Sequence, residues 1–222
     1  MKPIQPMEPM PPSMMARLKD NKIIQAWLVL ILAICFGSSL AGIQLSLGPR
    51  IEENKINETR EKVPELVLGA ARAQELAKAE KTLEIQPTSV AVTKNGRQTA
   101  YSVLEARDPE TGRIGWVVKA GGQGYADKIE LLLGLDPSAE EISGIFVLEQ
   151  KETPGLGNKI IEEDWRGQFI GRQTDRPLEV VKDRADEENE ISAITGATIS
   201  SRAVATIVNT AVADLKGKLA AQ

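Results

Sequence analysis

The chain has 222 residues, a formal net charge of -4 at pH 7 and an isoelectric point near 5.2. That length accommodates one ordinary domain with accessory segments, and an acidic chain without a clustered basic face is not a nucleic-acid-binding protein. The sequence has no histidine and a single cysteine, Cys35. Imidazole metal sites, nucleophile–histidine pairs and an internal disulfide are therefore excluded, and one cysteine makes no metal site. Redox chemistry here would need a bound cofactor, and we assign no catalytic side chain.

The first 48 residues divide into a tail and an apolar segment. Prolines and methionines are frequent in residues 1–22, which we predict to be a disordered tail. Residues 23–48 carry no charged side chain, and a bilayer needs about 20 apolar residues to be crossed. The alternatives are a cleaved signal peptide and a buried core helix. The length of the run and the lack of a clear cleavage site favour an uncleaved transmembrane helix.

The charges that flank this segment leave its orientation open. Arg17, Lys19 and Lys22 precede it and only Arg50 follows closely, which mildly favours a cytoplasmic N-terminus. A wider window adds three basic residues on the far side and removes most of the bias.

Residues 49–86 are charged and rich in alanine, a composition with high helix propensity. We predict a helical stalk here, with a break or a new helix start at Pro64.

From residue 87 onward the composition is typical of β-structure. Short apolar runs are separated by turn sequences such as Asn95-Gly96 and Asp136-Pro137, and such short connections imply antiparallel neighbours. The expected strands are residues 89–92, 100–104, 114–118, 129–133, 142–148 and 178–181, with helices at 159–169 and 200–219 and an acidic loop at 183–189. We therefore predict that residues 87–222 form an α+β domain, a mainly antiparallel sheet packed by helices.

Two loops contain candidate binding residues. Thr195-Gly196-Ala197-Thr198 precedes the last predicted helix, and a helix N-terminus favours a phosphate. Taken alone, the hydroxyls there are more often simple helix caps. The second loop, Glu152 to Gly157, holds two glycines and a proline and can let a flat ring approach the backbone, although such loops are commonly plain connectors. Another glycine-rich turn ends in Gly124-Tyr125 and lacks the spacing of a dinucleotide-binding motif.

In this order, the apolar segment, Gly124-Tyr125, the Glu-Thr-Pro-Gly-Leu-Gly loop and the Thr-Gly-Ala-Thr motif resemble the FMN-binding domain family. The resemblance is strongest to those members that serve as the G subunit of Rnf-type electron-transport complexes. It covers nearly all of the chain after residue 22. The two motifs together are highly specific, whereas each alone is weak.

The resemblance implies that FMN is bound covalently, through a phosphoester between its phosphate and the hydroxyl of Thr198. It also implies that a separate FMN transferase, using FAD and a divalent metal ion, makes this bond. The other site residues that it implies are Thr195, Gly196, Ala197 and Ser201 around the phosphate, Glu152, Thr153, Leu156 and Gly157 near the flavin ring, and Gly124 with Tyr125. One residue departs from the family pattern: many members have an aspartate six residues before the modified threonine, where this chain has Ser192.

The function implied is that of a membrane-anchored flavoprotein subunit that relays electrons in a complex coupling ferredoxin:NAD electron transfer to sodium-ion or proton translocation. Its partners would be the other subunits of that complex, in a bacterial cytoplasmic membrane with the C-terminal domain on the extracytoplasmic side. Three alternatives stay open: the equivalent C subunit of a sodium-pumping NADH:quinone reductase, a flavin domain of another extracytoplasmic reductase, and a flavin-free assembly subunit.

Overall fold

The computed structural model describes residues 22–79, 81–94 and 96–221. Two compact units are separated between Asn54 and Lys55. The tail predicted for residues 1–22 lies outside the described residues except for Lys22.

The first unit contains the N-terminal part of helix α2 (Lys22–Leu68). An 18-residue window of α2 has a mean hydropathy of 2.2 and is not buried in the protein. Large apolar side chains, such as Trp27 and Ile31, are therefore exposed along it. Among the described residues this is the one helix long and apolar enough to cross a membrane, in agreement with the predicted span.

The break expected at Pro64 is wrong, because α2 continues to Leu68 and the short helix α3 (Ala70–Lys78) follows Gly69. A proline inside a helix removes one backbone hydrogen bond. Its neighbours Val63 and Leu66 are 0% and 5% exposed and belong to an apolar cluster on the sheet. Burial of these two side chains offsets the lost hydrogen bond and keeps this turn helical.

The second unit is built on a six-stranded antiparallel sheet whose strands follow one another in sequence order. Its strands are β1 (Glu84–Lys94), β2 (Arg97–Asp108), β3 (Gly112–Gln123), β4 (Lys128–Leu135), β5 (Glu141–Glu149) and β6 (Arg172–Gln173). Two further strands, β7 (Glu179–Val181) and β8 (Glu190–Ser192), pair in parallel. The predicted α+β class with a mainly antiparallel sheet is confirmed. β1 begins ahead of residue 87, and Pro87 is accommodated because β1 is an edge strand.

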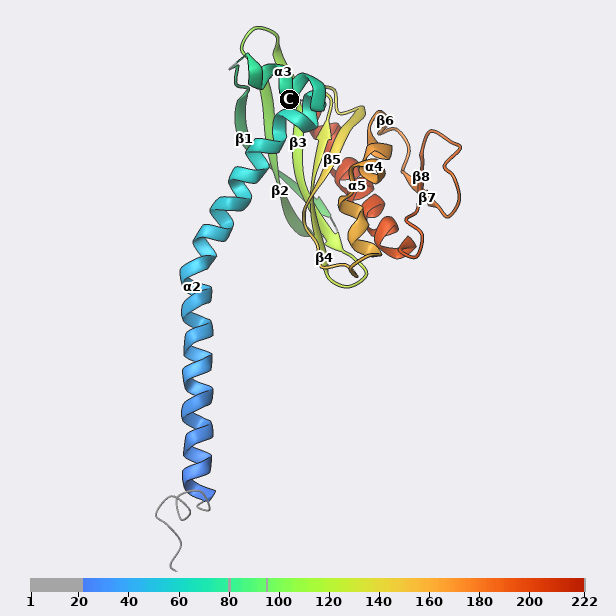
Figure 1. The fold of residues 1–222 in the computed structure, drawn as a ribbon. Coiled ribbons are helices and arrows are strands. Elements are labelled where there is room, and N and C mark those ends of the chain that lie inside the picture. The colour runs from blue at the N-terminus through green and yellow to red at the C-terminus, as the bar shows by residue number, and fades with distance from the viewer. Residues whose placement is uncertain (1–21, 80, 95, 222) are drawn as a thin grey trace, which may run out of the picture. The chain divides into compact units, whose positions relative to one another are not determined.

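Both faces of the sheet are covered by helices, on opposite sides in Figure 1. Leu131 and Leu133 of β4 belong to the larger core with helix α5 (Thr198–Leu219), whereas Leu132 belongs to the smaller core with the end of α2. Successive side chains of a strand point to opposite faces, so a strand buried on both sides is apolar throughout. The continuous apolar run of β4 has this origin.

The single helix expected over residues 159–169 is wrong. Three short helical turns occur instead: η1 (Gly157–Ile161), α4 (Glu163–Arg166) and η2 (Gly167–Phe169). Glu162 has extended backbone angles and separates η1 from α4. Trp165 and Phe169 meet edge to face in the core, with their ring centroids 5.2 Å apart.

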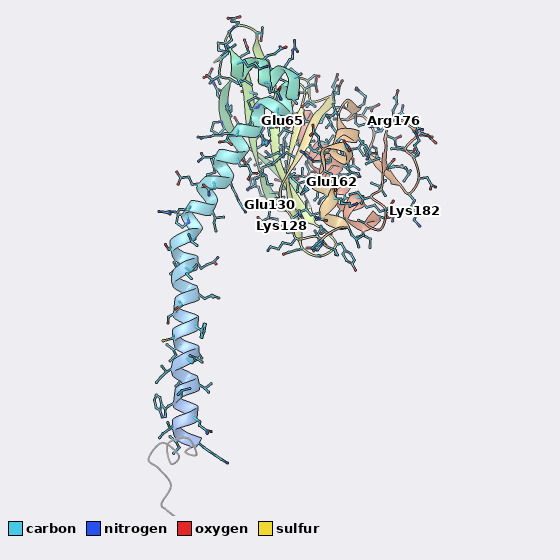
Figure 2. The ribbon with its side chains drawn as sticks, in the orientation of Figure 1. Glu65, Lys128, Glu130, Glu162, Arg176 and Lys182 are labelled. Carbon is cyan, nitrogen blue, oxygen red and sulfur yellow. The ribbon has the colours of Figure 1, made fainter. Side chains whose placement is uncertain are left out.

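An ion-pair network joins the sheet to residue 55 of α2. Glu130 of β4 lies within 4 Å of three ammonium groups: Lys128 at 2.6 Å, Lys119 at 3.5 Å and Lys55 at 3.9 Å. Glu130 and Lys128 are side by side on β4 in Figure 2. Because Lys128 is 62% exposed, the network contributes less to stability than the buried cores do.

Gly134 provides the first test of the fold. A Cβ at this position would lie 2.6 Å from the carbonyl oxygen of Leu66, so Gly134→Ala should push the end of α2 from the sheet. We expect the free energy of unfolding to fall by about 1–3 kcal/mol, measured by urea denaturation of the full chain in detergent. Gly217→Ala is the matched control, because a Cβ there meets nothing and favours the helix. Equal losses in both variants would contradict the packing argument.

Glu105 provides a test by pH. Burial acts to raise the pKa of Glu105, but hydrogen bonds from Arg113 and Arg107, at 2.7 and 2.9 Å, lower it below its ordinary value of 4.5. The resulting stabilisation is present above pH 4.5 and is lost as the pH falls through the folded-state pKa. Arg107 is 42% exposed, so screening limits the effect of Glu105→Gln to about 1 kcal/mol at neutral pH. Denaturation midpoints measured from pH 7 to 3 should converge for wild type and variant; parallel curves would refute this assignment.

Candidate functional site

The loop after β5 is shaped by its own sequence. Pro154 and Gly155 stand at the central positions of a turn in which the N–H of Leu156 donates to the carbonyl of Thr153 at 3.1 Å. Gly155 has a φ of +77°, and proline followed by a glycine with positive φ is the pattern of a type II turn. The turn leads directly into η1 and presents Leu156 with 44% of its surface exposed.

The start of α5 has no side-chain cap. The helix begins at Thr198 after Ala197, and Gly196 before it has a φ of +80°. Ser200 and Ser201 do not cap it: the Ser200 hydroxyl donates to Glu152 at 2.6 Å, and that of Ser201 donates to the carbonyl of Ala197 at 3.0 Å. The capping alternative is therefore wrong for these hydroxyls.

The turn between β3 and β4 approaches both segments. The N–H of Gly124 donates to the carbonyl of Asp127 at 2.8 Å, and Tyr125 is 62% exposed. Lys151, at the start of the second loop, pairs with Asp127 at 3.2 Å. The N–H of Lys128 and the ammonium of Lys151 hold the pKa of Asp127 below its ordinary value.

These three segments line one open cavity of about 520 Å³. It is lined by Tyr125, Thr153, Leu156, Gly157, Gly196, Ala197, Thr198, Ile199 and Ser200. The two motifs, some forty residues apart in the sequence, are thus brought together with Tyr125. Of the other predicted site residues, Gly124, Glu152, Thr195 and Ser201 do not line the cavity.

Glu152 lies beneath the cavity, where it is 4% exposed. Its Oε1 accepts from the N–H of Ala126 at 3.1 Å, and its Oε2 accepts from the Ser200 hydroxyl. A Cβ at Gly124 or Gly157 would overlap this carboxylate. The two glycines therefore leave the space that the buried carboxylate occupies.

Thr198 is half-buried at the cavity, and its hydroxyl has no hydrogen-bond partner among the described residues. It occupies the first turn of a 22-residue helix, whose leading N–H groups and dipole favour an anion. No acidic residue stands in that turn. The group bound here would most readily be a phosphate, and a cavity of this volume falls in the range of about 300–1,000 Å³ typical of cofactor sites.

The apolar side chains at the cavity would suit a planar aromatic group. Tyr125, Leu156 and Ile199 come from three separate segments and expose large apolar surfaces there. Ile199 and the contact of Ser200 with Glu152 were missed by reasoning from sequence. Proximity to Thr198 was the available signal for Ile199, whereas nothing in the sequence pairs Ser200 with a residue on another loop.

Ser192, which departs from the family pattern, lies at the end of β8 and does not line the cavity. Its hydroxyl accepts from the N–H of Ala185 at 2.9 Å, and its carbonyl accepts from the Trp165 indole, also at 2.9 Å. The residue therefore holds the preceding acidic loop.

Gly157 allows a direct test of this geometry. A Cβ there would lie 2.6 Å from Ser200 Oγ and 2.9 Å from Glu152 Oε2. We expect Gly157→Ala to destabilise the domain by about 1–3 kcal/mol and to speed tryptic cleavage at Lys151 and Lys159. In the control Gly167→Ala, the added Cβ meets no atom within 4 Å. Unchanged cleavage in both variants would show that the loop tolerates the added carbon.

Comparison with known proteins agrees with this geometry. Residues 124–213 match the model of the FMN-binding domain family. The chain is 37% identical over 139 residues to the G subunit of the proton-translocating ferredoxin:NAD(+) oxidoreductase complex of Clostridium ljungdahlii, covering 60% of this chain and 74% of that protein. It is 42% identical over 101 residues to the G subunit of the Na(+)-translocating ferredoxin:NAD(+) oxidoreductase complex of Acetobacterium woodii, covering 45% and 48% of the two chains.

A solved structure has the same fold. The crystal structure of NqrC from Shewanella oneidensis matches with a TM-score of 0.58 at 18% identity, over 75% of this chain and all of that one. The matched segment of the family model contains the cavity-lining residues of all three loops. The chain therefore belongs to the FMN-binding domain family, in which it is similar to the G subunits of the ion-translocating ferredoxin:NAD(+) oxidoreductase complexes.

Proposed function

We propose that this chain is a membrane-anchored flavoprotein subunit that carries FMN on the Thr198 hydroxyl and relays electrons within an Rnf-type ion-translocating oxidoreductase complex. One observation carries the proposal: a free hydroxyl, at the uncapped start of a long helix, opens into a cavity walled by the family's two motifs. Because the chain spans about half of the A. woodii relative and 74% of the C. ljungdahlii one, the activity of the whole complex is part of the proposal.

Attachment would proceed as a phosphoryl transfer. The bond between Thr198 Oγ1 and the flavin phosphorus would form while the pyrophosphate bond of FAD breaks, so that AMP would leave and the hydroxyl proton would pass to it or to solvent. An FMN transferase would hold FAD and its metal ion for this step. The chain itself contributes an accessible hydroxyl beside two small residues, Gly196 and Ala197, and helix N–H groups that stabilise the phosphate.

The remaining cavity residues would position the ring. Tyr125, Leu156 and Ile199 would exclude water from its faces. Bound FMN would supply the reversible electron acceptor that the side chains lack, because the chain has no histidine and a single cysteine.

The choice of complex rests on similarity to the G subunits. Identity to the two relatives of this kind is 37% and 42%, whereas identity to the C subunits of the Na(+)-translocating NADH-quinone reductases of Vibrio alginolyticus and Vibrio anguillarum is 28% and 32%. A C subunit of a sodium-pumping NADH:quinone reductase is the second candidate, since it shares both motifs. The cavity argues against a flavin-free assembly subunit, for which a free hydroxyl beside an apolar lining has no use.

We also propose that α2 crosses the bacterial cytoplasmic membrane once and that the FMN-binding domain lies on the extracytoplasmic side. The charge-free apolar segment supports the anchor. With Cys35 as its sole ionisable group, this segment offers no path for an ion. Ion translocation would therefore take place in other subunits of the complex.

The decisive experiment is in-gel flavin fluorescence after denaturing electrophoresis of the full chain co-expressed with an FMN transferase. Wild type should fluoresce and Thr198→Val should be dark, because valine lacks the hydroxyl that forms the phosphoester. Thr206→Val is the matched control: Thr206 is exposed on α5 and does not line the cavity, so this variant should stay fluorescent.

A dark wild-type band beside a fluorescent positive control would overturn the covalent carrier and favour the assembly subunit. Ser192→Asp, measured in the same gel, tests the departure from the family pattern. A brighter band than wild type would show that Ser192 limits modification.

A further inference from the structure

One buried carboxylate connects the three segments that form the cavity. Glu152 belongs to the loop after β5, its Oε1 binds the N–H of Ala126 in the β3–β4 turn, and its Oε2 binds the hydroxyl of Ser200 in α5. Tyr125 precedes Ala126, and Thr198 lies two residues before Ser200 in the first turn of α5. Each partner of Glu152 is thus close in the chain to a residue that lines the cavity.

The Glu152 side chain is buried and tightly packed. Its side chain is 4% exposed, and Ser200 is 2% exposed. Gly124 and Gly157 pack so closely on the carboxylate that a Cβ at either position would overlap it. A buried polar group without a hydrogen-bond partner costs free energy, so separation of the three segments at Glu152 would be unfavourable.

A second link between the same segments is far more exposed. Lys151 pairs with Asp127 at 3.2 Å, with the two side chains 66% and 50% exposed. Solvent-exposed ion pairs of this kind contribute little, whereas charge-assisted hydrogen bonds in a buried site are strong. The separation of the β3–β4 turn from the loop after β5 is therefore set by Glu152 and not by the surface pair.

We infer that Glu152 is a positioning residue of the flavin site. Its carboxylate fixes the distance between the β3–β4 turn, which carries Tyr125, and the first turn of α5, which carries Thr198. This inference rests on the proposed function, because it concerns how the same cavity receives FMN. Glu152 lies beneath the cavity and acts on the ring through these neighbours. Because the carboxylate lies beneath the cavity, its negative charge would also oppose electron uptake by a flavin bound there.

The first test needs no flavin. Hydrogen exchange, followed by mass spectrometry on the full chain in detergent, should show about tenfold faster exchange at residues 124–127 and 196–201 in Glu152→Ala than in wild type. Ser200→Ala removes one of the two links, so it should loosen residues 196–201 while leaving residues 124–127 protected. Lys151→Ala, which breaks the exposed pair, should change neither segment.

The second test uses the chain loaded with FMN by the transferase. In Glu152→Gln, which keeps the shape of the side chain and removes the charge, the flavin midpoint potential should shift to more positive values. Glu105→Gln is the matched control, since Glu105 is also buried, at 7% exposure, and does not line the cavity. A fold-stabilising role alone would leave the potential unchanged in both variants.

The outcomes separate this inference from the proposed function. Exchange in Glu152→Ala equal to that in Lys151→Ala would overturn the positioning role even if Thr198 carries FMN. A potential equal in Glu152→Gln and wild type would overturn the effect of the Glu152 charge on the flavin. A wild-type chain that takes up no FMN would overturn the proposed function. The exchange comparison would then still report whether Glu152 joins the three segments.

Discussion

The packing of α5 on one face of the sheet fixes where the first residue of that helix lies. Val204, Val208 and Leu215 are fully buried in the larger core. Because a helix is rigid over this length, their burial also places Thr198 near the turn between β3 and β4, where it lines the same cavity as Tyr125. The cavity therefore owes its position to core packing further along the same helix.

The loops around that helix end are held by polar contacts of very different strength. The surface pair of Lys151 with Asp127 is open to water, whereas Glu152 and Ser200 meet in the interior. The two serine hydroxyls near the helix start donate hydrogen bonds within the domain, whereas the hydroxyl of Thr198 has no hydrogen-bond partner among the described residues. This division of roles explains how three neighbouring hydroxyl residues can differ in chemistry.

The opposite face of the sheet serves a different purpose. There the end of α2 packs through Val63 and Leu66, and the absence of a side chain at Gly134 lets its backbone approach. A helix that begins as an apolar, exposed segment thus ends as part of a domain core. Pro64 remains helical because Val63 before it and Leu66 after it are buried.

The sequence by itself determined the features that depend on local pattern. Apolar runs separated by short turns indicated the antiparallel sheet, the charge-free run indicated the membrane segment, and the two motifs indicated the family. Each of these follows from residues close together in the chain, where hydrophobic period and turn chemistry act directly. Pattern failed at Pro64 and over residues 159–169, where distant packing overrides local propensity.

Tertiary structure decided the rest. Only the fold could show that Glu152 lies beneath the cavity, that Ser200 is its partner, and that Ile199 stands in the wall. Hydrogen bonds between residues that lie forty-eight positions apart leave no periodic signal in the sequence, because each partner is an ordinary polar residue in its own segment. Their meeting depends on the packing of a helix and a sheet, which is a property of the whole domain.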